Sequence, residues 1–137
     1  MNLMKRIFSF VLIALALSAC SATSLREKGW DDRVIGKGER LLLEGLNQYE
    51  EGAFKKSAES LNGALSEGLA FTKDRVTAHK YLAFIDCAAG REAACREQFA
   101  AALALDPALE LTSAEAGHPA WGPVFKTVKT RIARSTK

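Results

Sequence analysis

The chain has few of the residues on which enzymes depend. Its 137 residues include two histidines, His79 and His118, and neither an HxxxH nor an HExxH metal motif occurs. The nucleophile motif GxSxG, the Walker phosphate loop and the dinucleotide motif GxGxxG are also absent. Acidic pairs such as Glu50-Glu51 are adjacent in sequence, so their carboxylates point apart on a helix. We therefore expect no active site, metal, cofactor or small-molecule substrate, and a protein that is not an enzyme.

Long apolar runs are scarce as well. The run from Ile7 to Leu17 follows the basic residues Lys5 and Arg6, and it is shorter than the roughly 20 residues that a transmembrane helix needs. A basic start, a short apolar run and small residues after it are typical of a secretory signal. We therefore predict that residues 1–19 are a signal peptide.

The end of this signal resembles a bacterial lipobox. The tetrad Leu17-Ser18-Ala19-Cys20 closes the apolar run, and the resemblance implies cleavage before Cys20 and attachment of lipid to it. An ordinary signal peptide with a chance cysteine is the alternative. Acyl chains would hold the protein at the membrane with about 0.8 kcal/mol per buried methylene. Residues 20–29 would form a lipidated tether, and Ser21 in place of aspartate implies sorting to the periplasmic face of the outer membrane.

The mature chain lacks an excess of either charge. The full sequence has 19 basic and 16 acidic side chains, and Lys5 and Arg6 leave with the signal, so 17 basic and 16 acidic remain. A near-neutral domain gives no indication of nucleic acid binding. We expect one small domain over residues 30–137.

The segment from Asp74 to Pro107 predicts a helical hairpin and an all-α fold. Apolar residues recur there three to four positions apart, which is typical of amphipathic helices. Gly90 lies between the two stripes and is suited to the left-handed conformation that ends a helix. Pro107 disfavours helix at Asp106. The stripe residues are Val76, Tyr81, Leu82, Phe84 and Ile85, then Phe99, Ala102, Leu103 and Leu105.

An earlier segment has the same organisation. Leu41, Leu42, Leu46 and Tyr49 form one stripe before Gly52, and a second stripe comprises Phe54, Ala58, Leu61, Ala64 and Leu65. Gly52 lies 38 residues before Gly90. At the same offset, Gly45 matches Ala83, Ser57 matches Cys95, Leu61 matches Phe99, and Ala64-Leu65 matches Ala102-Leu103.

The later copy resembles a tetratricopeptide repeat. The residues that carry the resemblance are Leu82-Ala83, Gly90, Cys95, Phe99, Ala102-Leu103 and Asp106-Pro107. The family period is 34 residues, so about four extra residues separate the copies, and we place them in SEGLAFTKD. We predict two tetratricopeptide-like hairpins, preceded by a short helix from about Trp30.

The tail after Pro107 predicts a capping helix. A short extended or irregular piece from Leu109 to Leu111 leads to Ser113, which we interpret as a helix N-cap. Pro123 suits the first turn of a last helix, because its missing N–H is not needed there. This helix can cover the open apolar face of the second repeat. Its basic residues form either a solvated face or a contact with anionic lipid; they are Lys126, Lys129, Arg131 and Arg134.

Cys87 and Cys95 remain after lipidation takes Cys20. An even number of cysteines in an oxidising compartment favours a disulfide. Cys87 falls in the last turn of one predicted helix and Cys95 in the second turn of its antiparallel partner, so the pairing is geometrically possible. Two small buried thiols are the alternative.

The repeat resemblance also implies a binding surface. In tetratricopeptide arrays the first helices line a concave groove, and the matching positions here are Leu42, Leu46, Tyr49, Lys80 and Phe84. Because only Lys80 of the family's carboxylate clamp is present, an apolar groove for a segment of another protein is the better interpretation. The alternative is that the C-terminal helix fills this groove and leaves no site.

Two classes of function follow. The segment GHPAWGPVF, with Trp121 between two prolines, resembles small lipoproteins associated with type VI secretion. The first hypothesis is an outer-membrane-anchored interaction scaffold or assembly factor for an envelope machine, such as the type VI secretion apparatus. The second is a structural or cell-wall-associated lipoprotein, or an accessory subunit of a peptidoglycan enzyme.

Overall fold

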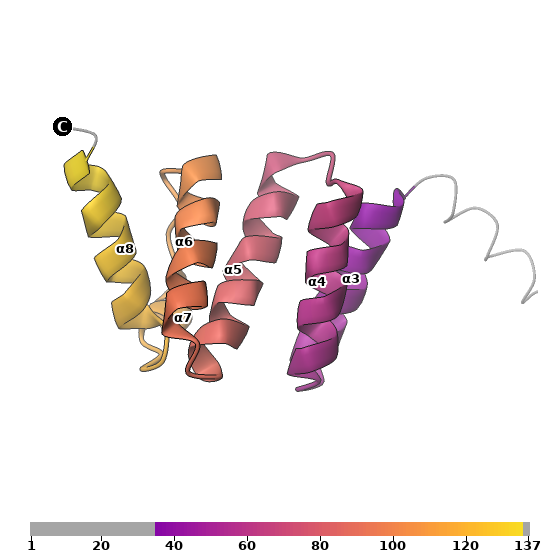
Figure 1. The fold of residues 1–137 in the computed structure, drawn as a ribbon, viewed down its shortest axis with the longest axis horizontal. Coiled ribbons are helices and arrows are strands. Elements are labelled where there is room, and N and C mark those ends of the chain that lie inside the picture. Colours follow the sequence, from indigo (N-terminus) through magenta and orange to yellow (C-terminus); the bar gives the residue numbers. More distant parts are fainter. Residues whose placement is uncertain (1–34, 136–137) are drawn as a thin grey trace, which may run out of the picture. The chain divides into compact units, whose positions relative to one another are not determined.

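The computed structural model describes residues 35–135. This part of the chain is all-helical, as predicted, and its elements stand in the order shown in Figure 1. They are α3 (Lys37–Glu50), α4 (Phe54–Glu67), α5 (Thr72–Ala88), α6 (Glu92–Leu105), the single turn α7 (Ser113–Ala116) and α8 (Gly122–Ser135). The predicted signal peptide (residues 1–19), the tether (residues 20–29) and the helix near Trp30 lie outside the described residues.

Helices α3 and α4 form one hairpin and α5 and α6 form another, each turning at the predicted glycine. Gly52 has a φ of 77° and Gly90 a φ of 73°, values that glycine adopts without steric cost. In both turns the next residue bonds back to the ending helix. The backbone N–H of Ala53 donates to the carbonyl of Gln48, and the backbone N–H of Arg91 donates to the carbonyl of Asp86, both at 2.8 Å. Each first helix thus ends in the same way.

The 38-residue offset extends to whole helices. Both bounds of α4 recur 38 residues later as the bounds of α6, and Glu50 and Ala88 end α3 and α5 at the same offset. Helix α5 begins earlier than its counterpart, at Thr72, although the offset would place its start at Arg75. The extra residues therefore lie in the linker after α4 and in the first turn of α5, inside the predicted segment.

Small residues let the two helices of each hairpin approach closely. A Cβ at Gly45 would lie 2.8 Å from Cγ of Leu61, and the Ser57 hydroxyl donates to the Gly45 carbonyl at 2.7 Å. In the second hairpin the equivalent positions, Ala83 and Cys95, are fully buried. The crossing point is therefore built alike in both hairpins.

Two hydrophobic clusters form the core. The first lies between α3, α4 and α5, and its buried members are Leu42, Leu61, Ala64, Leu69, Ala78, Leu82 and Ile85. The second lies between α5, α6 and α8, and its buried members are Ala83, Phe84, Cys95, Phe99, Leu103, Phe125 and Val128. Tyr49 and Tyr81 pack against both clusters. Helix α8 covers α6, as the capping prediction required.

The connection between α6 and α8 contains one correction. We predicted Ser113 as the N-cap of α7, but the cap is Thr112. The Thr112 hydroxyl accepts from the N–H of Glu115 at 3.2 Å, and the Glu115 carboxylate accepts from the N–H of Thr112 at 2.9 Å. This reciprocal capping box fixes the start of the turn one residue earlier. Residues 109–111 are irregular and Pro123 is the second residue of α8, both as predicted.

Candidate functional site

The structure buries two of the five residues predicted to line the concave groove. Leu42 is 5% exposed in the first core cluster, and Phe84 is 2% exposed in the second. Leu46, Tyr49 and Lys80 are half-buried. Little of Leu42 or Phe84 is therefore left for a partner to contact, because both side chains pack against the protein's own helices.

Phe84 is covered by the segment that leads into α8. The Trp121 ring stacks on the Phe84 ring at 4.6 Å between centroids, and the ring of His118 stacks in turn on Trp121 at 3.3 Å. Phe99 contacts Phe84 edge-on at 6.0 Å. The alternative prediction was a groove filled by the C-terminal helix, but the residue that covers Phe84 is Trp121. The filling side chain precedes the first residue of α8, and α8 itself packs on α6.

Lys80 is engaged inside the fold. Its ammonium group bonds the Glu115 carboxylate at 2.6 Å, with both side chains about four-fifths buried, and lies 5.3 Å from the Tyr81 ring centroid. Partial burial raises the pKa of Glu115, but hydrogen bonds from Lys80 and Thr112 outweigh it and hold the pKa below 4.5. An ammonium held in this way ties α5 to α7 and is not free to bind a partner's carboxylate.

Tyr49 occupies the junction of the two hairpins. Its ring contacts Tyr81 edge-on at 4.8 Å between centroids and Phe54 at 5.4 Å. Burial raises the pKa of the Tyr49 hydroxyl, and Tyr81 and Glu115 add to the effect. Together with the half-buried Leu46, Tyr49 is the part of the predicted groove that remains partly accessible.

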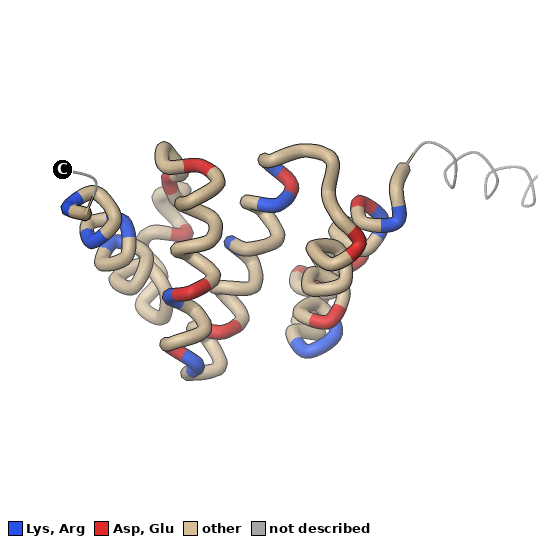
Figure 2. The backbone as a smooth tube through the Cα atoms, turned by 45° about the horizontal axis from the view of Figure 1, so that its top comes forward, with Lys and Arg blue, Asp and Glu red and all other residues tan. Residues whose placement is uncertain are grey.

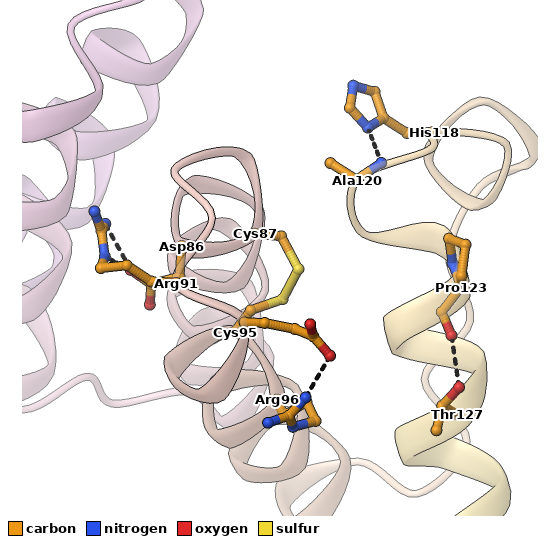
Figure 3. Close-up of a disulfide and its surroundings, with 10 residues drawn as sticks. Asp86, Cys87, Arg91, Cys95, Arg96, His118, Ala120, Pro123 and Thr127 are labelled. Atoms are coloured by element: carbon orange, nitrogen blue, oxygen red, sulfur yellow. Dashed lines mark hydrogen bonds and ion pairs between the residues drawn. A yellow bond between two sulfur atoms is a disulfide. The ribbon is translucent and has the colours of Figure 1, made fainter.

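The structure contains the predicted disulfide. Cys87 at the end of α5 and Cys95 in α6 are bonded, with 5.2 Å between their Cα atoms, as Figure 3 shows. Cys95 is fully buried and Cys87 half-buried. Beside the bond, Arg91 pairs with Asp86 at 2.7 Å across the turn. The disulfide therefore fastens the second hairpin at the position where Ser57 makes a hydrogen bond in the first.

Sequence reasoning missed a groove between the two hairpins. It has a volume of about 680 Å³ and lies between the first half of α4 and the end of α5. Phe54, which we had placed in the apolar stripe of α4, lines this groove and is 48% exposed. The repeat alignment already indicated that position 54 is exposed, because it matches Glu92 and not an apolar residue.

Helix α8 presents a basic face. Figure 2 shows only blue segments along it, and its sequence contains no acidic residue. Lys126, Arg131 and Arg134 are exposed. Lys129 instead turns back to the chain before α7, where it bonds the Leu109 carbonyl at 2.8 Å and the Glu110 carboxylate.

Both histidines contact neighbouring protein groups. Nδ1 of His79 lies 2.7 Å from Oε1 of Gln98, and Nδ1 of His118 accepts from the N–H of Ala120 at 3.2 Å. Among residues 35–135 there is no cluster of three or more His, Cys, Asp or Glu side chains suited to a metal. Within the same range, no helix combines the length and the apolar character needed to cross a membrane.

Comparison with known proteins assigns the N-terminal segment. Residues 4–21 match the family model described as a prokaryotic membrane lipoprotein lipid attachment site, and this span includes Cys20. The match supports a bacterial lipoprotein that associates with a membrane through its lipid. The searches of curated proteins and of solved structures found no significant match.

Proposed function

We propose that this lipid-anchored protein is a scaffold that holds a protein partner at the membrane, with two tetratricopeptide-like hairpins as the binding module. One observation carries the proposal: a helical hairpin that is repeated at a constant offset follows a lipid attachment site in the sequence. Stacked helical hairpins form extended surfaces that proteins use to bind other proteins. A lipid anchor confines such a surface to the membrane.

The tetratricopeptide assignment is supported by what the repeated positions do. Leu61 and Phe99 fill the same place in the two hairpins and are both fully buried, as are Ala64 and Ala102. These are the bulky and small positions that the family pattern requires, and their burial gives each a packing reason.

The proposals of an outer-membrane location and of a secretion machine are based on the sequence. Ser21 after the lipidated cysteine supports outer-membrane sorting, and GHPAWGPVF is the basis for type VI secretion. In the folded chain His118 and Trp121 of this segment pack over Phe84. The motif therefore has a role in packing, and the proposal for the secretion machine depends on resemblance alone.

The second candidate is a structural or wall-associated lipoprotein, or an accessory subunit of a peptidoglycan enzyme. The burial of Leu42 and Phe84 favours it, because it removes part of the predicted binding groove. The two candidates differ in whether a protein partner is bound in a fixed ratio.

Co-purification separates them. The tagged full-length protein is crosslinked in cells, solubilised from the envelope with detergent, and its partners are quantified beside those of Cys20→Ser. A scaffold recovers one partner in a fixed ratio, and loss of the anchor lowers that recovery while the protein stays folded. Recovery of no partner in a fixed ratio would contradict the scaffold and favour the structural role.

A further inference from the structure

The groove between the hairpins has an apolar floor that is open to solvent. Figure 1 shows α4 and α5 diverging toward the end of α5, and the groove lies there, lined on its apolar side by Phe54, Ala58, Ile85, Ala88 and Ala89. Its volume of about 680 Å³ is within the range of ligand-binding clefts. Phe54 leaves 48% of its surface exposed and makes one ring contact, with Tyr49.

The second hairpin has charged residues where the first has Phe54 and Ala58. At the 38-residue offset, Phe54 corresponds to Glu92 and Ala58 to Arg96, and Glu92 and Arg96 form an ion pair. Both line the corresponding depression between α6 and α8. An aromatic residue at this position is therefore not a requirement of the repeated hairpin. The Phe54 ring contacts Tyr49 on one side and leaves about half of its surface open to a partner.

One end of the groove is positively charged. Lys55 lines the groove and forms no ion pair with another residue in the described part of the chain, whereas Arg91, another lining residue, is paired with Asp86. The groove also reaches the start of α4, whose N-cap residue Ala53 supplies no side-chain hydrogen bond. The free N–H groups and dipole of that helix end favour a negative group. Glu59, one turn further along α4, also lines the groove and places a negative charge next to this end.

We propose that this groove binds a segment of a partner protein that places an apolar side chain against Phe54 and a carboxylate beside Lys55. The pairing follows from the apolar floor and the cationic end. This inference rests on the scaffold function proposed above, and it moves the contact from the predicted concave groove to the seam between α4 and α5. The partner is thus defined by its chemistry: an acidic segment with an apolar anchor.

Photo-crosslinking in cells tests the inference on the full-length lipoprotein. Phe54 is replaced by the photoreactive aromatic p-benzoylphenylalanine, and the same amino acid is placed at Glu92 as the matched control in the other hairpin. We expect a protein adduct from position 54 and not from position 92. Peptide mapping of the adduct should find the attachment at an apolar residue with Asp or Glu nearby in the partner's sequence.

Substitutions decide whether the groove itself makes the contact. Ala58→Arg copies the second hairpin and fills the groove, so it should lower the adduct yield about tenfold or more, as loss of a central contact does. Lys55→Glu should lower it by charge repulsion. Phe71→Glu changes a phenylalanine that is 65% exposed and lies outside the groove, and it should leave the yield unchanged. Far-UV circular dichroism verifies that each variant is folded.

Each other outcome overturns the inference. An adduct with a second copy of this chain or with lipid would assign the groove to a different occupant. An adduct from position 54 that survives Ala58→Arg would place the contact outside the groove. If the wild-type protein recovers a partner in a fixed ratio but position 54 gives no adduct, the groove is wrong and the scaffold stands. If no partner is recovered at all, the scaffold fails and the groove fails with it.

Discussion

Truncation of Phe84 to alanine measures how firmly the tail covers the second hairpin. Phe84 is 2% exposed, stacks on Trp121 and contacts Phe99 edge-on. In an open concave groove this ring would contribute to binding. In the observed arrangement it contributes to folding.

The size of the expected loss follows from this burial. Removing a buried phenylalanine side chain costs about 3–5 kcal/mol, which combines the lost transfer free energy with the cavity left behind. Favourable ring pairs add about 0.5–1.5 kcal/mol beyond the buried area, and the Phe84 ring contacts those of Tyr81, Phe99 and Trp121. We expect Phe84→Ala to lower the free energy of unfolding by about 4 kcal/mol. That is a large part of the roughly 5–15 kcal/mol typical of small domains.

Urea unfolding followed by far-UV circular dichroism provides the measurement. Phe54→Ala is the matched control, because it removes the same side chain from a site that is 48% exposed. It should cost about 1 kcal/mol or less. Trp121→Ala should lower stability in the same direction as Phe84→Ala, since it uncovers the same ring.

A loss below about 1 kcal/mol for Phe84→Ala, no larger than that for Phe54→Ala, would refute this reasoning. Phe84 would then be accessible in solution, and the tail would not be seated over it. Recovery of envelope partners by Phe84→Ala, measured in parallel under conditions where the variant is folded, should equal that of the wild type.

Three further predictions concern the anchor, the disulfide and the buried ion pair. Cys20→Ser should abolish incorporation of labelled lipid and membrane association; a labelled, sedimenting variant would contradict the attachment site. Alkylation without reductant should leave Cys87 and Cys95 unmodified by mass, and replacing both with serine should lower the free energy of unfolding by about 2–3 kcal/mol. Two alkylated thiols in periplasmic protein would exclude the bond. Because the pKa of Glu115 is held below 4.5, its ionised form stabilises the fold at neutral pH, and this stability is lost as pH falls through the lower pKa of the folded state. Glu115→Gln should therefore flatten the fall in unfolding free energy between about pH 5 and pH 3; an unchanged slope would show that the carboxylate contributes nothing.

The repeated hairpins could be predicted because their determinants are local. Gly52 and Gly90 supply the positive φ that ends each first helix. Both turns could therefore be recognised from the sequence alone. The small residue Gly45 faces the large residue Leu61 where the two helices cross. Because this packing needs one small and one large residue, the same pattern recurs at the constant offset between the copies. The two cysteines likewise lie on facing helices close to the turn of the second hairpin, which gave a geometric reason to predict that they pair.

The accessible surface could not be predicted in the same way. Phe84 is buried because Trp121 stacks on it, and Trp121 comes from an irregular stretch without helical periodicity. Phe54 continues an apolar stripe at helical spacing, but the divergence of α4 from α5 leaves it open. Both outcomes depend on where one element lies relative to another that is distant in sequence. Helical periodicity carries no information on that relation.

The two hairpins, whose cores meet at Tyr49 and Tyr81, are held closed by different interactions, and this difference has a mechanical consequence. If the proposed partner is pulled away from the membrane, the tension on the lipid-anchored chain enters the described helices at the start of α3. The first hairpin is held by noncovalent packing and the Ser57 hydrogen bond. The second is closed by the disulfide and clamped by α8. Under such a load the first hairpin should therefore unfold before the second, so that the chain lengthens in its first hairpin while the disulfide-bonded half keeps its shape.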